Sequence, residues 1–324
     1  MLIRRLLVLA TASALALTAA ALLVLPAAPA AAQEVVQDEG SAYRAWYEAN
    51  QAKDIPKAAA AAKDYLAKYP SGQYAANLSK WLTPVEYESA LKDKRLDDAL
   101  KAGRQLLAGD PESLLVPYQL AFTIWSTELI ASPPKFDHLA DAVEFSNKAM
   151  TLIDGGKTLP GVDKNVALAW MNQVLAISAA KAGKVEEALA LYGKSTTLAP
   201  GNVQLVTRNL YAVYGYRQAA YADAVKAFKA LPEADQQAPD AKPEAKAALD
   251  RANSEADNLV DAAAAFVAYS KSKGVAAPMR ERVNQALETV YKSRHPEDAA
   301  LAGLQKILQE KEAALGAPAP APGD

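Results

Sequence analysis

The sequence contains no cysteine and only two histidines among its 324 residues. The absence of cysteine excludes disulfides, thiolate metal ligands, cysteine nucleophiles and a lipid anchor on cysteine. An exported protein without disulfides depends on its hydrophobic core for stability. With 51% hydrophobic residues, the chain is long enough to build one or two such cores.

Aromatic residues are also scarce, at 7%, and β-branched runs of the kind that strands need are almost absent. Alanine is abundant instead, which favours close helix–helix packing over a large sheet. A net charge of −2 provides no basic surface for nucleic acid. We therefore expect an all-α protein that does not bind nucleic acid.

The first 32 residues have the pattern of an export signal. Arg4 and Arg5 precede a mostly apolar stretch from Leu6 to Leu25, and small residues follow up to Ala32. We expect cleavage after Ala32 and a periplasmic or secreted bacterial protein without a membrane span. An uncleaved membrane anchor is the alternative, because a run of about 20 apolar residues can cross a bilayer.

Helical periodicity continues from about residue 41 to about residue 314, with turn signals every 15–20 residues or so. The expected helices are 41–53, 55–68, 73–82, one starting at Thr83-Pro84, 96–108, 113–131, 139–153, two within 169–200, 203–217, 221–230, 244–273, 278–293 and 296–314. Tyr118, Phe122 and Trp125 share one helical face, which we expect to belong to the core.

Residues 169–200 carry the clearest pattern, two short amphipathic helices joined at Gly183. Small, aromatic and proline residues recur in the order found in one known repeat, at Leu175, Ala176, Ala188, Tyr192 and Pro200. By these residues the segment resembles a tetratricopeptide repeat, a family of stacked helix pairs.

Other segments share parts of this pattern. Residues 205–231 resemble the same unit through Ala212, Tyr221, Ala224 and Phe228, and Ala224 follows Ala188 by 36 residues, close to the family period of about 34. Ala58 with Pro70 and Ala99 with Pro111 repeat the 12-residue spacing of Ala188 and Pro200. The pattern departs from the family at Asn172, where a tryptophan is usual, and in residues 113–155.

The resemblance implies an all-α fold of antiparallel helix pairs stacked into a right-handed solenoid. The expected organisation is a signal peptide (1–32), a loose segment (33–40), a tetratricopeptide-like domain (41–231), a polar loop or hinge (232–243), a C-terminal helical segment (244–314) and a disordered Ala/Pro tail (315–324).

Tetratricopeptide arrays commonly bind partners on the concave face made by their first helices, which the resemblance maps onto eight residues. These are Trp170, Gln173, Ile177, Lys181, Asn209, Val213, Tyr216 and Arg217. Such a face could hold an extended peptide through amide hydrogen bonds, with Lys181 or Arg217 meeting a carboxylate.

No catalytic, metal or cofactor site is expected. His138 stands near Asp137 and Asp141, but three ligands of this kind make a weak metal site, and capping of a helix explains Asp137. Gly156-Lys157-Thr158 lacks the earlier glycine of a phosphate loop, since Thr151 occupies that position. The Ser-x-x-Lys matches at Ser178 and Ser270 lack the companion motifs of penicillin-binding enzymes.

These observations favour an exported, non-enzymatic scaffold that binds a protein or peptide in the cell envelope. Two alternatives stay open. One is an envelope assembly protein that associates with itself through alanine-rich helices, and the other is a helical hydrolase or lyase that uses carboxylates on cell-wall or glycan polymers.

Overall fold

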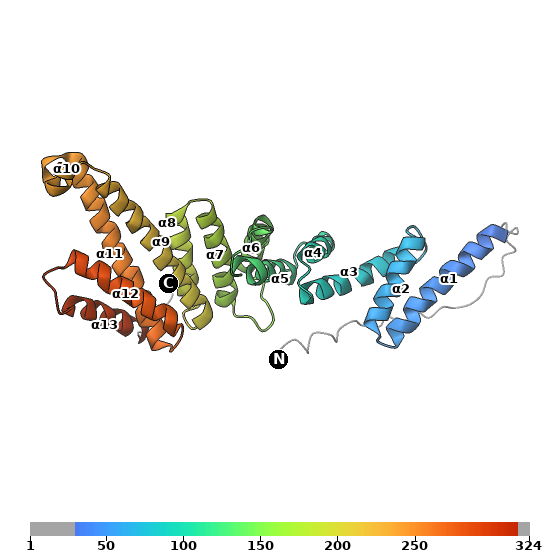
Figure 1. Cartoon of the computed structure of the whole chain (residues 1–324). Helices are drawn as coiled ribbons and strands as arrows, with labels where there is room; N and C mark the ends of the chain where they lie inside the picture. The colour runs from blue at the N-terminus through green and yellow to red at the C-terminus, as the bar shows by residue number, and fades with distance from the viewer. Residues whose placement is uncertain (1–29, 317–324) are drawn as a thin grey trace. The chain divides into compact units, whose positions relative to one another are not determined.

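The structure, a computed structural model, describes residues 30–316 (Figure 1). Almost all of the predicted export signal precedes these residues and residues 317–324 of the predicted tail follow them, so these parts of the two predictions lie outside the described residues. The predicted tail begins too early, because Leu315 and Gly316 belong to a helix that ends at Gly316. The chain divides by its contacts into two units, residues 1–82 and residues 83–324, which we describe separately.

The predicted all-α class is confirmed, since residues 30–316 form helices and no strand. The helices are α1 (Ala30–Gln51), α2 (Ile55–Lys68), α3 (Ala75–Lys92), α4 (Leu96–Gly109), α5 (Leu115–Ile124), α6 (Leu139–Asp154), α7 (Lys164–Lys181), α8 (Val185–Leu198), α9 (Val203–Lys229), α10 (Glu233–Gln237), α11 (Pro243–Ser272), α12 (Ala277–Arg294) and α13 (Ala302–Gly316), with a π-helix η1 (Trp125–Leu129) and a 3-10 helix η2 (Pro239–Ala241). None of them is both long enough and apolar enough to span a membrane.

Three helices have the same length and the same spacing to the proline that follows them. The helices α2, α4 and α8 each have 14 residues and end two residues before Pro70, Pro111 and Pro200. The fourth residue of each is an alanine with no exposed surface: Ala58, Ala99 and Ala188. The spacing from alanine to proline that the sequence repeats is therefore a repeated helix with a repeated contact.

The turns that lead into these helices are also alike. Each contains a residue with positive φ two positions before the helix: Lys53, Lys94 and Gly183, at 58°, 58° and 77°. The next residue donates its backbone N–H to the carbonyl of a residue five positions earlier, at 2.9–3.0 Å, and the three acceptors are the buried alanines Ala49, Ala90 and Ala179. This bond closes the end of the first helix, and in α1/α2 and α7/α8 the two alanines let the paired helices approach closely.

Each unit has its own core. In residues 30–82, Tyr65, Leu78 and Leu82 are buried between α2 and α3. In the second unit one cluster runs from the end of α3 to α9, and it includes Trp125, while Tyr118 and Phe122 pack against it as predicted. A second cluster joins α9, α11, α12 and α13.

The break predicted between residues 217 and 221 is wrong, because α9 is one helix of 27 residues. The intervening Gln218-Ala219-Ala220 contains only good helix formers, so nothing ends the helix there. Residues 205–231 are consequently not a helix pair. Figure 1 shows α9 and α11 side by side, with α10 and η2 where the predicted polar loop was expected.

Other predicted boundaries also differ. A new helix was expected at Thr83, but α3 continues through Pro84, which removes one backbone N–H without ending the helix. Residues 113–131 form α5 followed by the π-helix η1. Residues 33–40 belong to α1, whose Asp38 and Glu39 accept hydrogen bonds from the Tyr69 and Tyr65 hydroxyls.

The buried alanine contact makes a direct prediction. Ala188→Leu should lower the free energy of unfolding by about 1–3 kcal/mol, because the larger side chain has no space between α7 and α8. Ala190→Leu, at an exposed position of the same helix, is the matched control and should change it by less than about 0.5 kcal/mol. Urea unfolding followed by circular dichroism measures both, and equal losses would contradict the role of Ala188.

Candidate functional site

The second half of α9 carries a stripe of residues that no other described helix covers completely. The stripe follows the spacing i, i+3, i+4, i+7, which places its members on one helical face. Its members on α9 are Gln218, Tyr221, Ala222, Val225, Lys226 and Lys229, and Ala230, the next residue after the helix, continues the stripe. With Leu259 of α11 and Ala286 and Val290 of α12, this stripe lines an open groove of about 670 Å³, which we call the α9 groove.

The α9 groove has an apolar floor and a cationic rim. Leu259 is buried, and Tyr221, Val225 and Val290 are partly buried, so these side chains form its base. Lys226 and Lys229 are exposed, and they are the two charged residues among the ten that line the groove. Within the described residues neither ammonium group has an ion-pair or hydrogen-bond partner, so both are available to an anionic ligand.

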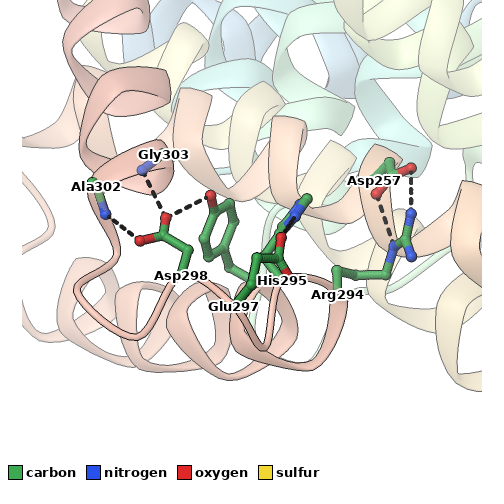
Figure 2. A network of polar contacts seen from close by, with 8 residues as sticks. Asp257, Arg294, His295, Glu297, Asp298, Ala302 and Gly303 are labelled. Atoms are coloured by element: carbon green, nitrogen blue, oxygen red, sulfur yellow. Dashed lines mark hydrogen bonds and ion pairs between the residues drawn. The ribbon is translucent and has the colours of Figure 1, made fainter.

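Polar contacts fix the α12 wall of the groove (Figure 2). The Arg294 guanidinium donates from Nε and Nη2 to the two carboxylate oxygens of Asp257 on α11, at 3.1 and 3.2 Å. This paired geometry specifies orientation as well as attraction. The last turn of α12 is therefore held against α11, close to where Val290 lines the groove.

A second contact in Figure 2 ties α12 to α13. The Asp298 carboxylate accepts hydrogen bonds from the backbone N–H groups of Ala302 and Gly303 and from the Tyr291 hydroxyl, at 2.8–3.0 Å. The bonds from Gly303 and Ala302 lower the pKa of Asp298, against a smaller opposing effect of desolvation. Gly303 allows this arrangement, because a Cβ there would collide with the Tyr291 hydroxyl.

This cap also corrects a predicted boundary. The helix expected from residue 296 begins only at Ala302, because Asp298 caps it and residues 295–301 form the turn. His295 contacts Glu297 through Nδ1 at 3.3 Å within that turn.

Three of the eight residues predicted to bind a partner are buried. Trp170, Gln173 and Asn209 are 7%, 2% and 0% exposed. The Trp170 ring lies against Trp125, with centroids 4.2 Å apart, and meets Phe122 edge-on at 5.5 Å. These three side chains pack in the interior and offer almost no surface to a partner.

Gln173 and Asn209 do come together, in a buried polar contact. Gln173 Nε2 donates to Asn209 Oδ1 at 2.5 Å, and Asn209 Nδ2 donates to Ser195 Oγ at 2.9 Å. Ser195 Oγ in turn donates to the Ala169 carbonyl at 2.7 Å. This network connects α7, α8 and α9, and buried networks of this kind fix the alignment of the helices that share them.

The other five predicted residues are each engaged within the chain. Ile177, Val213 and Tyr216 pack against the cluster around Ala188 and Tyr192. The Lys181 ammonium lies 4.6 Å from the centre of the Phe136 ring. Arg217 pairs with Glu186 at 3.0 Å and lies 3.8 Å from Glu255. A role of these residues in binding stays a prediction.

His138 lies in a second polar cluster, which connects η1, α4 and the start of α6. Its Nδ1 contacts Glu128 Oε1 at 2.7 Å, its backbone N–H donates to Glu128 Oε2, and its Nε2 contacts Asp97 at 3.1 Å. The predicted capping role of Asp137 is wrong, because His138 occupies the cap position of α6 and Glu128 satisfies its N–H. No three acidic or histidine side chains in residues 38–315 are placed to hold a metal ion.

The surroundings of His138 favour its protonated form. Desolvation disfavours the imidazolium, but the hydrogen bonds to Glu128 and Asp97 outweigh it, and the pKa of His138 is raised above its usual value. Glu128 itself is buried and also accepts the Lys135 N–H on its carbonyl. The cluster therefore anchors the loop between η1 and α6 through a charged contact.

The sequence analysis did not identify the α9 groove, although Tyr221, Val225 and Lys229 have helical spacing within the helix expected at 221–230. The pattern shows that these residues share a face, but it does not show that the face stays uncovered. The contribution of Leu259 and Val290 could not be found in the same way, since it depends on which faces of α11 and α12 meet α9.

Comparisons with protein-family models, with curated proteins and with solved structures give no match to the chain.

The His138 cluster predicts a stability that depends on pH. Because the pKa of His138 is raised in the folded protein, its contribution is complete below the unfolded value of about 6.5 and is lost as the pH rises through the folded value. His138→Gln should therefore lower the free energy of unfolding more at pH 5.5 than at pH 8.5. The difference between the losses at the two pH values should shrink when Glu128→Gln is also present. Urea unfolding at both pH values measures these losses, and a loss for His138→Gln that does not depend on pH would contradict the charged contact.

The Asp298 cap predicts the opposite dependence. A lowered pKa stabilises the folded state above the unfolded value of about 3.9, and this contribution disappears as the pH falls through the folded value. At pH 7, Asp298→Asn should increase hydrogen exchange at Ala302 and Gly303, measured by mass spectrometry. Glu297→Gln, a neighbouring change outside the cap, should leave the same amides unaffected, and unchanged exchange in Asp298→Asn would rule out the cap.

Proposed function

We propose that this chain is an exported, non-enzymatic scaffold of the tetratricopeptide type that binds a protein or peptide partner in the cell envelope. The observation that carries the proposal is the α9 groove, a helical stripe with an apolar floor that the described helices leave uncovered. Surfaces of this kind are where helical proteins receive other chains.

The repeated helix pairs support the proposed family type. The pairs α1/α2, α3/α4 and α7/α8 share the turn, the bond that closes the first helix and the two buried alanines. Helix pairs with a common contact can stack on their neighbours, and a right-handed solenoid is the stacking that we propose here.

The non-enzymatic role is inferred from how the polar side chains are used. The His138–Glu128 contact anchors a loop, Asp298 caps α13, and Gln173 with Asn209 connects three helices. Each of these groups has a structural partner that accounts for its position. The export is inferred from the residues before Gln33, whose charged, apolar and small-residue segments follow the order of a secretory signal.

The α9 groove rather than the predicted first-helix face is our proposed binding surface. Tyr221, Val225 and Val290 present apolar surface there, whereas Trp170, Gln173 and Asn209 are buried. Arg217 precedes Gln218 at one end of the groove, so one of the eight predicted residues borders it in sequence.

Site-specific photocrosslinking tests the proposal. A photoreactive phenylalanine analogue at Ala222, an exposed groove residue, should crosslink to a distinct protein in intact cells of the native host. The same analogue at Ala227, exposed on α9 but outside the groove, is the matched control and should not. Absence of a product at Ala222 would contradict the proposal, and a product that contains only a second copy of the chain would favour self-association instead.

A further inference from the structure

We propose, on the basis of the proposed function, that the partner enters the α9 groove as an amphipathic acidic helix of about three turns. Its apolar face would cover Tyr221, Val225 and Val290, and its carboxylates would meet Lys226 and Lys229. Length, spacing and charge each support this choice of occupant.

The length of the groove sets the length of the helix. The stripe on α9 extends from Gln218 to Ala230, and 12 residues at about 1.5 Å rise each span about 18 Å. A second helix lying along this distance would contribute about 12 residues, or about three turns. A segment of this size contacts the whole stripe.

The spacing of the lining residues favours a helix over other occupants. Six of the ten come from one helix at intervals of three and four, which is the row pattern that another helix packs against. An extended peptide that adds to a sheet edge has no edge to join in residues 30–316. A small molecule is usually enclosed on most sides, whereas Gln218, Ala222 and Ala230 are exposed.

The charge of the rim indicates the charge of the occupant. Lys226 and Lys229 are three residues apart on α9, so both ammonium groups are on the groove side. The helix dipole favours lysines anywhere in the last turn of α9, including the neighbouring positions 227 and 228. The helix dipole does not explain why Lys226 and Lys229 both border an apolar floor. Carboxylates of a partner helix would complement the two ammonium groups.

The first test maps the crosslinked partner. The segment attached to the analogue at Ala222 should be an apolar sequence of period 3–4 with Asp or Glu beside it. If the segment is extended, uncharged or basic, the inference fails while the scaffold proposal survives. If no partner is attached, the scaffold proposal itself fails.

The second test uses two synthetic probes and does not require the natural partner. One is a fluorescent 14-residue helical peptide with leucines along one face and glutamates beside them, and the other has lysines in place of the glutamates. Fluorescence anisotropy with the full chain should show binding of the acidic peptide at least 10-fold tighter than that of the basic one.

Charge reversal then tests the two lysines directly. K226E with K229E should weaken the acidic peptide at least 10-fold and strengthen the basic one, and this gain also shows that the variant is folded. K164E with K194E changes two exposed lysines outside the groove and should affect neither peptide. Equal affinity for the two peptides, or no change on reversal at 226 and 229, would overturn the proposal.

Discussion

α9 is about twice as long as α8, the helix against which its first half packs, and this difference creates the groove. α8 has 14 residues and α9 has 27, which correspond to about 21 Å and about 40 Å. α8 can therefore cover only the first half of α9, where Leu205 and Val206 are buried. Beyond that point α11 packs along α9, and the stripe from Gln218 to Ala230 stays open.

Two kinds of contact hold α9 in this position. Its first half is fixed by the buried bond between Gln173 and Asn209, since moving α9 along α7 would leave both amides without their partner. Its second half is fixed by apolar packing, with Tyr221 against the cluster that contains Leu259 and Phe266. Polar contacts specify the alignment of α9, and apolar contacts supply most of the burial.

The sequence predicts much of this fold because three prolines and one glycine mark where helices end. Gly183 tolerates positive φ, and the prolines at 70, 111 and 200 cannot continue a helix. The repeated spacing from alanine to proline correctly indicates three equivalent helices. The partner alanines at 49, 90 and 179 have no such signature, because alanine is too common in this chain for one position to be distinctive.

The failures have a different cause, which is that local preference does not determine tertiary contact. Nothing in Gln218-Ala219-Ala220 favours a break, and the expected one came from fitting a repeat period to a continuous helix. The family pattern likewise placed Gln173 and Asn209 on a solvent face, whereas their amides meet in the interior. Amide side chains suit either setting, so only the packing of α7, α8 and α9 decides between them.

The departure from the repeat is also what gives the second unit a surface of its own. A regular array would follow α8 with a short pair, and the next helix would cover the face that the α9 groove leaves open. Here α9 and α11 are long and pack along each other, and buried alanines such as Ala256 and Ala263 permit their close approach. The far side of the α9 groove is formed by α12, whose last turns are held by the contacts of Arg294 and Tyr291.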